Sequence, residues 1–363
     1  MKAKLDFEGK LSLDEIYAQH HNGQLEGAPE NILDKGRAYF MGDNLPILLH
    51  LLPQLKGKID LIYIDPPFGT GQPFVDIHQE QAYSDQLEGD AFLAFLWKRL
   101  IVLREFLSEQ GSIYVHIDKK VGHYVRVMLD EIFGPTNHIN DLTRIKCNPK
   151  NFSRKAYGNF SDMILFYAKN RDQHIWNDLT EPLREEEVQQ LFPRIHPTHG
   201  PYTTHPLHAP GETRSGDTGQ EWKGLMPPPG RHWRFSREEL DRLEAAGRIE
   251  WSSTGNPRKI VFAKDHKGKK IQDVWTFKDK GLSYVDYPTQ KNHDLLQRII
   301  LNSSHENSWI MDAFAGSGGT LWVAESLKRK WIGMDQSPMA INLANKQIEK
   351  LQLEVESRTW NPS

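Results

Sequence analysis

Residues 59–68 read Ile-Asp-Leu-Ile-Tyr-Ile-Asp-Pro-Pro-Phe, an apolar run that stops at an acid and two prolines. A nearly continuous run of β-branched and apolar residues is typical of a strand that is buried on both faces of a parallel sheet. Because proline cannot donate a ladder hydrogen bond, we expect this strand to end at Ile64. The stretch therefore predicts a central parallel strand with Asp65 at its carboxyl end.

Strands and helices are expected to alternate on both sides of this run. A long amphipathic helix is predicted from Asp90, as its cap, to Gln110, with Gly111 as its stop. The periodicity predicts further strands over 37–41, 112–117, 163–168, 309–314 and 331–334, and helices over 45–55, 121–133, 295–301 and 338–351. Such alternation indicates an α/β fold with a doubly wound, mostly parallel sheet.

The length predicts either two domains or one large α/β domain with an insertion, because the chain has 363 residues and a domain has about 150. Residues 171–287 are polar, rich in turn residues and dotted with tryptophans, and we interpret them as an inserted unit. The sheet domain is then expected in two halves, residues 1–170 and 288–363. Roughly the first 30 residues would be peripheral to it.

Composition limits the class of protein. Hydrophobic residues make up 38% and charged residues 26%, which is ordinary for a globular chain. No apolar run approaches the ~18 residues that span a bilayer, and residues 1–10 lack the apolar stretch of a signal peptide. We therefore expect a cytoplasmic protein, in which the single cysteine, Cys147, is a structural thiol.

The net charge of −3 gives no global attraction to nucleic acid, so such a partner would need local basic patches. A run of like charge is more often a solvated face, which remains the alternative. The candidate nucleic-acid-binding residues are Lys146, Lys150, Arg154, Lys155, Arg231, Arg258 and Lys259.

The insert contains four closely spaced histidines, and imidazole is a common zinc ligand. They are His196, His199, His205 and His208. Zinc sites of this spacing usually include cysteine or a carboxylate and lie on defined hairpins or helices. We expect a histidine-rich loop here and no metal.

Residues 312–320 read Asp-Ala-Phe-Ala-Gly-Ser-Gly-Gly-Thr where a strand is expected to turn into a helix. Glycines at such a turn allow a ligand to approach the backbone, and Asp335 follows at the next strand end, where a carboxylate can bind ribose hydroxyls. Leu321 occupies the place of the third glycine of a dinucleotide motif, and the Gly-Lys-Ser/Thr of a P-loop is absent. A nucleoside ligand other than NAD or a nucleoside triphosphate is favoured, with a plain tight turn as the alternative.

The tetrapeptide Asp65-Pro66-Pro67-Phe68 suits a planar base that carries an exocyclic amino group. Asp65 and the Pro66 carbonyl could accept the two amine hydrogens, and Phe68 could stack on the ring. Held this way, the amine directs its lone pair at an incoming electrophile. A rigid turn that merely ends a strand is the alternative.

Together these motifs resemble the beta group of amino-directed DNA methyltransferases, in which a catalytic D-P-P-[YF] motif precedes an F-x-G-x-G cofactor motif. The order matches here, from Asp65 to Phe314-Ala315-Gly316-Ser317-Gly318, and the resemblance covers roughly residues 37–351. It implies a circularly permuted fold of the S-adenosylmethionine-dependent methyltransferase type, with a target-recognition insert similar to that of solitary and type III modification methyltransferases.

The resemblance also implies roles for individual residues. Two departures are visible, Gly69 where the family often has asparagine and Asn292 where it often has proline. The implied catalytic residues are Asp65, Pro66, Pro67 and Phe68. The implied cofactor-binding residues are Asp43, Asn44, Asp312, Phe314, Ala315, Gly316, Ser317, Gly318, Asp335 and Lys291.

The implied reaction is transfer of a methyl group from S-adenosylmethionine to N6 of a flipped adenine in duplex DNA, as in restriction-modification systems. Asp at the first motif position is commoner in adenine-directed members, and N4 of cytosine is the alternative. A catalytically silent DNA-binding subunit, an RNA or protein substrate, and a nicotinamide oxidoreductase are alternatives of other classes. Besides DNA, the resemblance raises two candidate partners: a separate restriction endonuclease, and a second copy of this chain in a homodimer.

Overall fold

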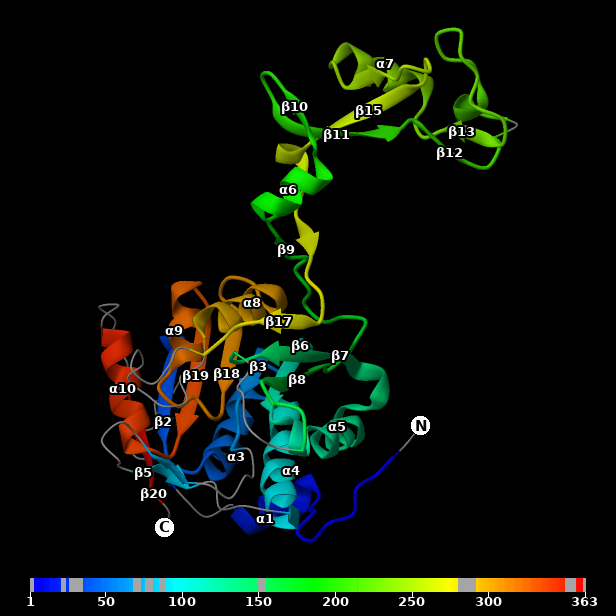
Figure 1. Ribbon diagram of the computed structural model, residues 1–363. Helices are drawn as coiled ribbons and strands as arrows, with labels where there is room; N and C mark the ends of the chain where they lie inside the picture. Colours follow the sequence, from blue (N-terminus) through cyan, green and yellow to red (C-terminus); the bar gives the residue numbers. More distant parts are fainter. Residues whose placement is uncertain are drawn as a thin grey trace. The chain divides into compact units, whose positions relative to one another are not determined.

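The computed structural model describes residues 3–20, 24–25, 35–67, 73–75, 81–84, 89–148, 155–213, 215–279, 292–349 and 357–361. The chain divides into two compact units (Figure 1). The sheet unit comprises Met1–Leu179 and Gln272–Ser363, and the insert unit comprises Thr180–Ile271. None of the described helices combines the length and apolar character needed to cross a membrane.

A ten-stranded sheet forms the centre of the sheet unit. Its strands, in spatial order, are β1 (Gln24–Leu25), β20 (Ser357–Asn361), β2 (Arg37–Met41), β19 (Lys330–Asp335), β18 (Trp309–Asp312), β3 (Ile59–Ile64), β6 (Leu107–Ile117), β8 (Ser161–Ala168), β7 (His138–Ile145) and β17 (Val274–Thr276). Every pairing from β20 to β6 is parallel, whereas β8 runs antiparallel to both neighbours. The expected α/β fold with a mostly parallel sheet is thus confirmed.

The order of the strands shows how the two ends of the chain share one sheet. β18 and β19, from the C-terminal part, lie between β2 and β3, from the N-terminal part. In register, Ile310 of β18 lies opposite Leu61 of β3, and Met311 lies opposite Ile62. Sequence motifs from opposite ends of the chain therefore end side by side.

Helices cover both faces of this sheet (Figure 1). One group consists of α1 (Leu13–His20), α3 (Asn44–Leu55), α4 (Gly89–Phe106) and α5 (Lys119–Phe133). The other consists of α8 (His293–Ser303), α9 (Gly319–Ser326) and α10 (Pro338–Glu349). A short strand pair, β4 (Pro73–Val75) with β5 (Gln81–Ser84), lies outside the main sheet.

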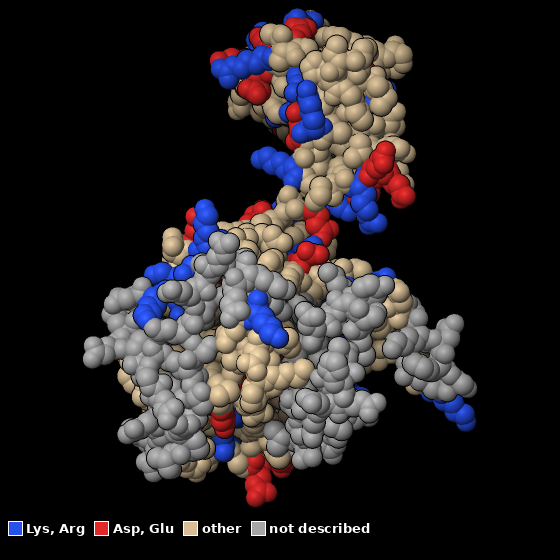
Figure 2. Space-filling view, turned by 90° about the vertical axis from the view of Figure 1, so that its left-hand side faces the viewer, with Lys and Arg blue, Asp and Glu red and all other residues tan. Residues whose placement is uncertain are grey.

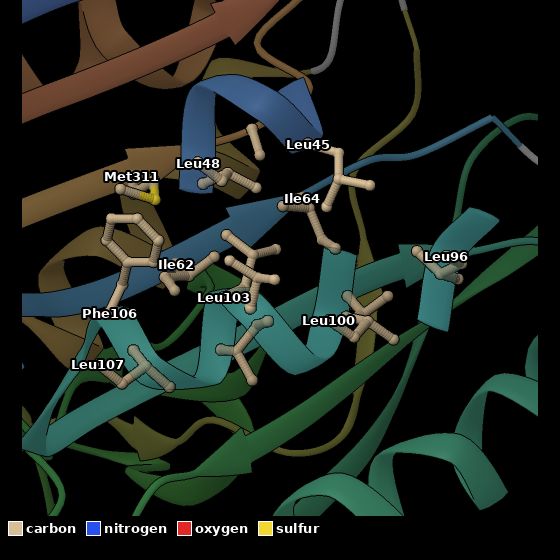
Figure 3. Close-up of a cluster of buried hydrophobic side chains, with 14 of the residues drawn as sticks. Leu45, Leu48, Ile62, Ile64, Leu96, Leu100, Leu103, Phe106, Leu107 and Met311 are labelled. Atoms are coloured by element: carbon tan, nitrogen blue, oxygen red, sulfur yellow. The ribbon is translucent and has the colours of Figure 1, made fainter. Parts of the chain in front are cut away.

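The main core lies between β3 and the helices α3 and α4. Ile62 and Ile64 of β3 are fully buried and point toward Leu100 and Leu103 of α4 (Figure 3). Burial of each such side chain contributes about 1.5–3 kcal/mol. Leu61 and Tyr63, which alternate with the isoleucines, are also buried. Burial on both faces explains why the sequence of β3 is nearly continuous in apolar residues.

The predicted helix up to Gln110 is wrong at its C-terminal end. α4 ends at Phe106, and β6 begins at Leu107, which pairs with Ile59 of β3. Gly111 is therefore no helix stop. It lies within β6, where a Cβ would come within 2.8 Å of the carbonyl oxygen of Ile59. The register with β3 shifts between the pairs Ile59–Leu107 and Leu61–Ser112, so residues 108–111 form an irregularity in the strand. The approach of the chain to β3 thus ends the helix in spite of the helical periodicity of this segment.

The insert unit contains an antiparallel sheet in the order β10 (Arg194–His196), β11 (Gly200–Pro206), β15 (Pro257–Phe262) and β14 (Ile249–Trp251). Its other elements are β9 (Thr180–Glu181) with β16 (Lys269–Lys270), β12 (His208–Pro210) with β13 (Arg231–Trp233), α6 (Glu185–Leu191) and α7 (Arg237–Ala245). Its small core is formed by Leu207, Trp222, Trp233 and Leu240.

Asn44, the first residue of α3, ties the two halves of the sheet unit together. Its Nδ2 donates to the carbonyl oxygen of Ala313, which follows β18, at 2.6 Å. Its Oδ1 accepts from Nε of Arg99 on α4. Asn44 and Arg99 are both buried, so water cannot replace either bond.

We expect Asn44→Ala to lower the free energy of unfolding by about 1–3 kcal/mol, because it leaves a buried guanidinium N–H and a buried carbonyl without this partner. The urea unfolding transition followed by tryptophan fluorescence measures the change. Asn140→Ala, at an exposed asparagine of β7, is the matched control and should stay within about 0.5 kcal/mol of the wild type. Equal midpoints for the two variants would contradict the bridging role of Asn44.

Candidate functional site

Four aspartates lie where four neighbouring parallel strands end. Asp43 follows β2, Asp335 ends β19, Asp312 ends β18 and Asp65 follows β3. We call this edge of the sheet the carboxyl edge. In open α/β sheets, ligands bind just outside the carboxyl ends of the strands. The structure therefore brings the two sequence motifs to one place.

The glycine-rich turn after β18 is fastened to the end of β19. Asp335 accepts the backbone N–H of Gly316 on Oδ2 at 2.9 Å and that of Ser337 on Oδ1 at 2.8 Å. Gly316 has φ 53° and Gly318 has φ 80°, which favour glycine. A Cβ on Gly318 would lie 2.8 Å from Cβ of Ala344. The turn is therefore held in a shape that side chains at these two glycines would prevent.

Burial keeps the carboxylates of this turn from ionising as readily as usual. Burial, with smaller contributions from the charges of Asp65 and Asp335, raises the pKa of Asp312 to about 7. This occurs although Oδ1 of Asp312 accepts the N–H of Phe314 at 3.0 Å. Burial likewise raises the pKa of Asp335, and its backbone hydrogen bonds offset part of that effect. The carboxyl edge thus brings carboxylates together in a buried setting that disfavours their ionisation. A cationic ligand bound there would favour the ionised forms.

Asp43 and Asn44, predicted to bind the cofactor, already have internal partners. Asp43 caps α3 by accepting the N–H of Leu45 at 3.0 Å, and it accepts from Arg99 at 2.6 Å. Its side chain remains 53% exposed, so a ligand can still reach it. Asn44 is buried and acts as the bridge described above.

Asp65 follows β3 and is half-buried, with Pro66 buried beside it. Its Oδ1 lies 4.0 Å from Nδ1 of His116, a fully buried residue of β6. His116 also contacts the hydroxyl of Tyr63 through Nδ1 at 2.9 Å and Oδ2 of Asp162 through Nε2 at 3.3 Å. The sequence reasoning missed this cluster, although a histidine inside the apolar strand 112–117 was a visible signal.

Two predicted site residues, Phe68 and Lys291, lie outside the described residues. The helix expected after Lys291 is present, because α8 begins at His293. Asn292, which departs from the family pattern, is its N-cap and accepts the N–H of Asp294 at 2.8 Å. Asparagine is among the preferred N-cap residues, so the departure from the family pattern is compatible with a helix that starts here.

The candidate nucleic-acid-binding residues of the sheet unit do not share one setting. Lys146 donates to Oδ1 of Asp162 at 2.6 Å and is only 26% exposed, so it forms an internal ion pair. Lys155 is exposed. Lys150 and Arg154 lie outside the described residues.

In the insert unit the candidate cations also contact neighbouring groups. Arg231 donates to Nδ1 of His208 at 3.1 Å, and Nε of Arg258 donates to the hydroxyl of Thr204 at 2.8 Å. Lys259 lies over the ring of Phe235, 4.6 Å from its centroid. On the visible face of this unit, lysines and arginines are interspersed with acidic residues (Figure 2).

The histidines of the insert form a pair and two separate residues. The Nδ1 atoms of His196 and His199 lie 3.3 Å apart. The expected histidine-rich loop is wrong, because His196 ends β10, His205 lies on β11 and His208 begins β12. Within the described ranges, no three His, Cys, Asp or Glu side chains are grouped so as to hold a metal ion.

Comparison with known proteins adds to this geometry. Residues 59–346 match the family model described as DNA methylase. The type II methyltransferase M.EcaI of Enterobacter cloacae is 38% identical over 358 residues, which cover 96% of this chain and 78% of that protein. The Mod subunit of the type III restriction-modification enzyme StyLTI of Salmonella typhimurium is 25% identical, over 80% of this chain.

The chain spans only 50% of that Mod subunit's length. The crystal structure of the M1.HpyAVI–SAM complex superimposes with a TM-score of 0.45 at 13% identity, covering 85% of this chain and 98% of that one. The family model includes the strand ends that carry Asp65 and Asp335 and most of the chain. The chain therefore belongs to the DNA methylase family.

Proposed function

We propose that this chain is a site-specific DNA methyltransferase that methylates the exocyclic N6 of an adenine rotated out of duplex DNA. One observation carries the proposal: Asp65-Pro66-Pro67 and the glycine-rich turn closed by Asp335 end neighbouring strands of one sheet. Membership of the DNA methylase family supports methyl transfer to DNA. The similarity to M.EcaI, a type II methyltransferase, supports it further.

S-adenosylmethionine is the proposed cofactor, and when bound it supplies an electrophilic methyl group on a sulfonium. The carboxyl edge fits such a ligand. Asp335 accepts the backbone N–H groups of Gly316, Ser337 and Gln336, and a carboxylate with about four lone-pair sites keeps one for a ribose hydroxyl. Gly316 and Gly318 leave the backbone open to close approach, and the exposed carboxylate of Asp43 can accept from an amino group.

Asp65 and Pro66 are the proposed reaction partners of the base. The Asp65 carboxylate and the Pro66 carbonyl accept the two amine hydrogens and so direct the nitrogen lone pair toward the methyl carbon. As the nitrogen–carbon bond forms and the carbon–sulfur bond breaks, Asp65 accepts the proton that the nitrogen loses. Catalysis then comes from alignment of the reacting atoms and from acceptors placed where positive charge develops.

Adenine is the proposed base because the motif begins with Asp65, whereas serine is commoner there in cytosine-directed members. The insert unit is the proposed reader of the target sequence. We further infer that DNA cleavage belongs to a separate restriction endonuclease, since the Salmonella relative is named as the Mod subunit of a restriction-modification enzyme.

The product of the reaction tests the proposal directly. We expect the full chain, incubated with S-adenosylmethionine and unmethylated genomic DNA, to yield N6-methyladenine when the DNA is digested to nucleosides and analysed by mass. N4-methylcytosine instead would retain the mechanism and overturn the choice of base. No methylated nucleoside, with cofactor binding shown by calorimetry, would overturn the proposed activity.

Asp65→Asn should lower kcat about 10²-fold or more, because the amide accepts the amine hydrogens weakly and cannot take up a proton. The dissociation constant for S-adenosylmethionine should stay within a few fold of the wild type. Asp60→Asn is the matched control, since Asp60 lies at the opposite end of β3, where it accepts from Ser108 at 2.8 Å. Near-normal turnover of Asp65→Asn would remove Asp65 from the mechanism.

Asp335→Asn should weaken cofactor binding roughly tenfold, because one carboxylate oxygen is replaced by a donor that cannot accept a ribose hydroxyl. The turnover number at saturating cofactor should change much less. Calorimetric titration of the protein with S-adenosylmethionine gives the first quantity, and steady-state kinetics gives the second. If affinity is unchanged and kcat alone falls, Asp335 does not bind the cofactor.

A further inference from the structure

His116 is a buried titratable residue directly behind Asp65. It lies on β6 with a side chain that is fully buried. In the parallel register, Tyr63 pairs with Tyr114 and Ile64 with Val115, so the next position on β6 faces the start of the Asp65 turn. The register thus explains why Nδ1 of His116 lies 4.0 Å from the Asp65 carboxylate.

The opposite nitrogen of His116 is held by an acid from the next strand. Nε2 lies 3.3 Å from Oδ2 of Asp162 on β8, and Asp162 is almost fully buried. Burial by itself would raise the pKa of Asp162, but hydrogen bonds from His116 and Lys146 outweigh it and hold that pKa well below its usual range. Independently of His116, Lys146 lies with its Nζ 2.6 Å from Oδ1 of Asp162 and favours the carboxylate. An anion next to Nε2 in turn favours the imidazolium form of the ring.

The cations in the wider surroundings of His116 lie next to carboxylates. Lys146 lies 3.9 Å from Asp118, and Arg144 lies 3.5 Å from Asp162. Arg144 also pairs with Asp279. The titratable and charged groups that face this cluster are Tyr63 and Asp65 from β3, Asp118 after β6, Arg144 and Lys146 from β7 and the residue after it, Asp162 from β8, Asp279 after β17, and Asp312 from β18.

Among these described groups, three carboxylates that are largely shielded from solvent, Asp65, Asp118 and Asp162, face two cations, Arg144 and Lys146, whereas Asp279 is 41% exposed. Asp312 adds a fifth carboxyl group, which burial keeps partly protonated near neutral pH. The hydroxyl of Tyr63 adds no charge, because burial and the nearby carboxylates raise its pKa well above the ordinary value. A proton on His116 reduces the excess of negative charge and offsets the cost of burying a cation.

We propose that His116 is a positioning residue for methyl transfer: as an imidazolium anchored by Asp162, it holds Asp65 in place as a carboxylate. This inference rests on the proposed function of Asp65. A positive charge on Nδ1, 4.0 Å from Oδ1 of Asp65, attracts the carboxylate and opposes its displacement from the end of β3. After each transfer, the imidazolium also favours release of the proton that Asp65 has accepted.

His116→Gln tests this role, because glutamine retains an N–H donor and removes the charge. We expect the acid limb of the kcat profile to move to higher pH, because the variant lacks the positive charge that His116 carries next to the reacting group. The KM values for DNA and cofactor should stay within twofold. His123→Gln is the matched control, at an exposed histidine of α5, and should keep the wild-type profile.

A second measurement tests the charge without relying on activity. In wild-type protein labelled with 15N-histidine, one of the 16 histidines should still show imidazolium shifts at pH 8. That signal should be absent from His116→Gln and should lose its proton by pH 8 in Asp162→Asn. If His116→Gln fails to fold, the loss of the signal in Asp162→Asn assigns it to the histidine paired with Asp162, and absence of any imidazolium signal at pH 8 in the wild type needs no variant to overturn the role.

The outcomes separate this inference from the proposed function. If the wild type yields no methylated nucleoside, the proposed function fails, and the spectrum still decides whether His116 is charged. If the wild type is active and His116→Gln keeps the wild-type acid limb, the positioning role is overturned. A wild-type spectrum with no imidazolium at pH 8 overturns it as well.

Discussion

The parallel alignment of β2, β19, β18 and β3 is the constraint on which the rest of this molecule depends. Two strands from the C-terminal part are inserted between two from the N-terminal part, and their register places four strand ends together. Because side chains alternate along a strand, a slip of one residue would turn Asp65 or Asp312 to the opposite face. The Asn44 bridge to Ala313 fastens the same junction from the helix side.

Assembling carboxylates at one buried edge is unfavourable for the folded protein by itself. The raised pKa values of Asp312 and Asp335 are the direct sign of this cost. Natural proteins tolerate such local conflict mainly where function requires it. A cofactor that carries a sulfonium and an ammonium group would relieve it, so the arrangement is better suited to a cationic nucleoside than to an anionic dinucleotide. The electrostatics and the glycine-rich turn therefore favour the same class of ligand.

Much of the sheet could be predicted from the sequence, because strands such as 59–64 are buried on both faces and carry an unmistakable apolar run. The boundary between α4 and β6 could not, since residues 107–110 fit a helical pattern and only the pairing of Leu107 with Ile59 of β3 marks the start of the strand. The acids at the strand ends were predictable from motif spacing. The cluster behind Asp65 was not, because Asp162 comes from an antiparallel strand whose register the sequence does not reveal. For the same reason the sequence suggested Lys146 as a nucleic-acid-binding residue, whereas in the structure it pairs with Asp162.

The cluster around His116 also extends to the chain that returns from the insert unit. β17 joins the sheet beside β7, where Thr143 donates its N–H to the carbonyl oxygen of Asp273 at 2.8 Å. Just beyond β17, Asp279 pairs with Arg144, which lies 3.5 Å from Asp162. Close contacts thus run from the segment after the insert unit, through Arg144, Asp162 and His116, to Asp65. Arg144, Asp162 and His116 are buried, so solvent screens their charges little, whereas Asp279 at the start of this series is 41% exposed. The residues that follow the insert unit are therefore part of the electrostatic environment of the reacting carboxylate.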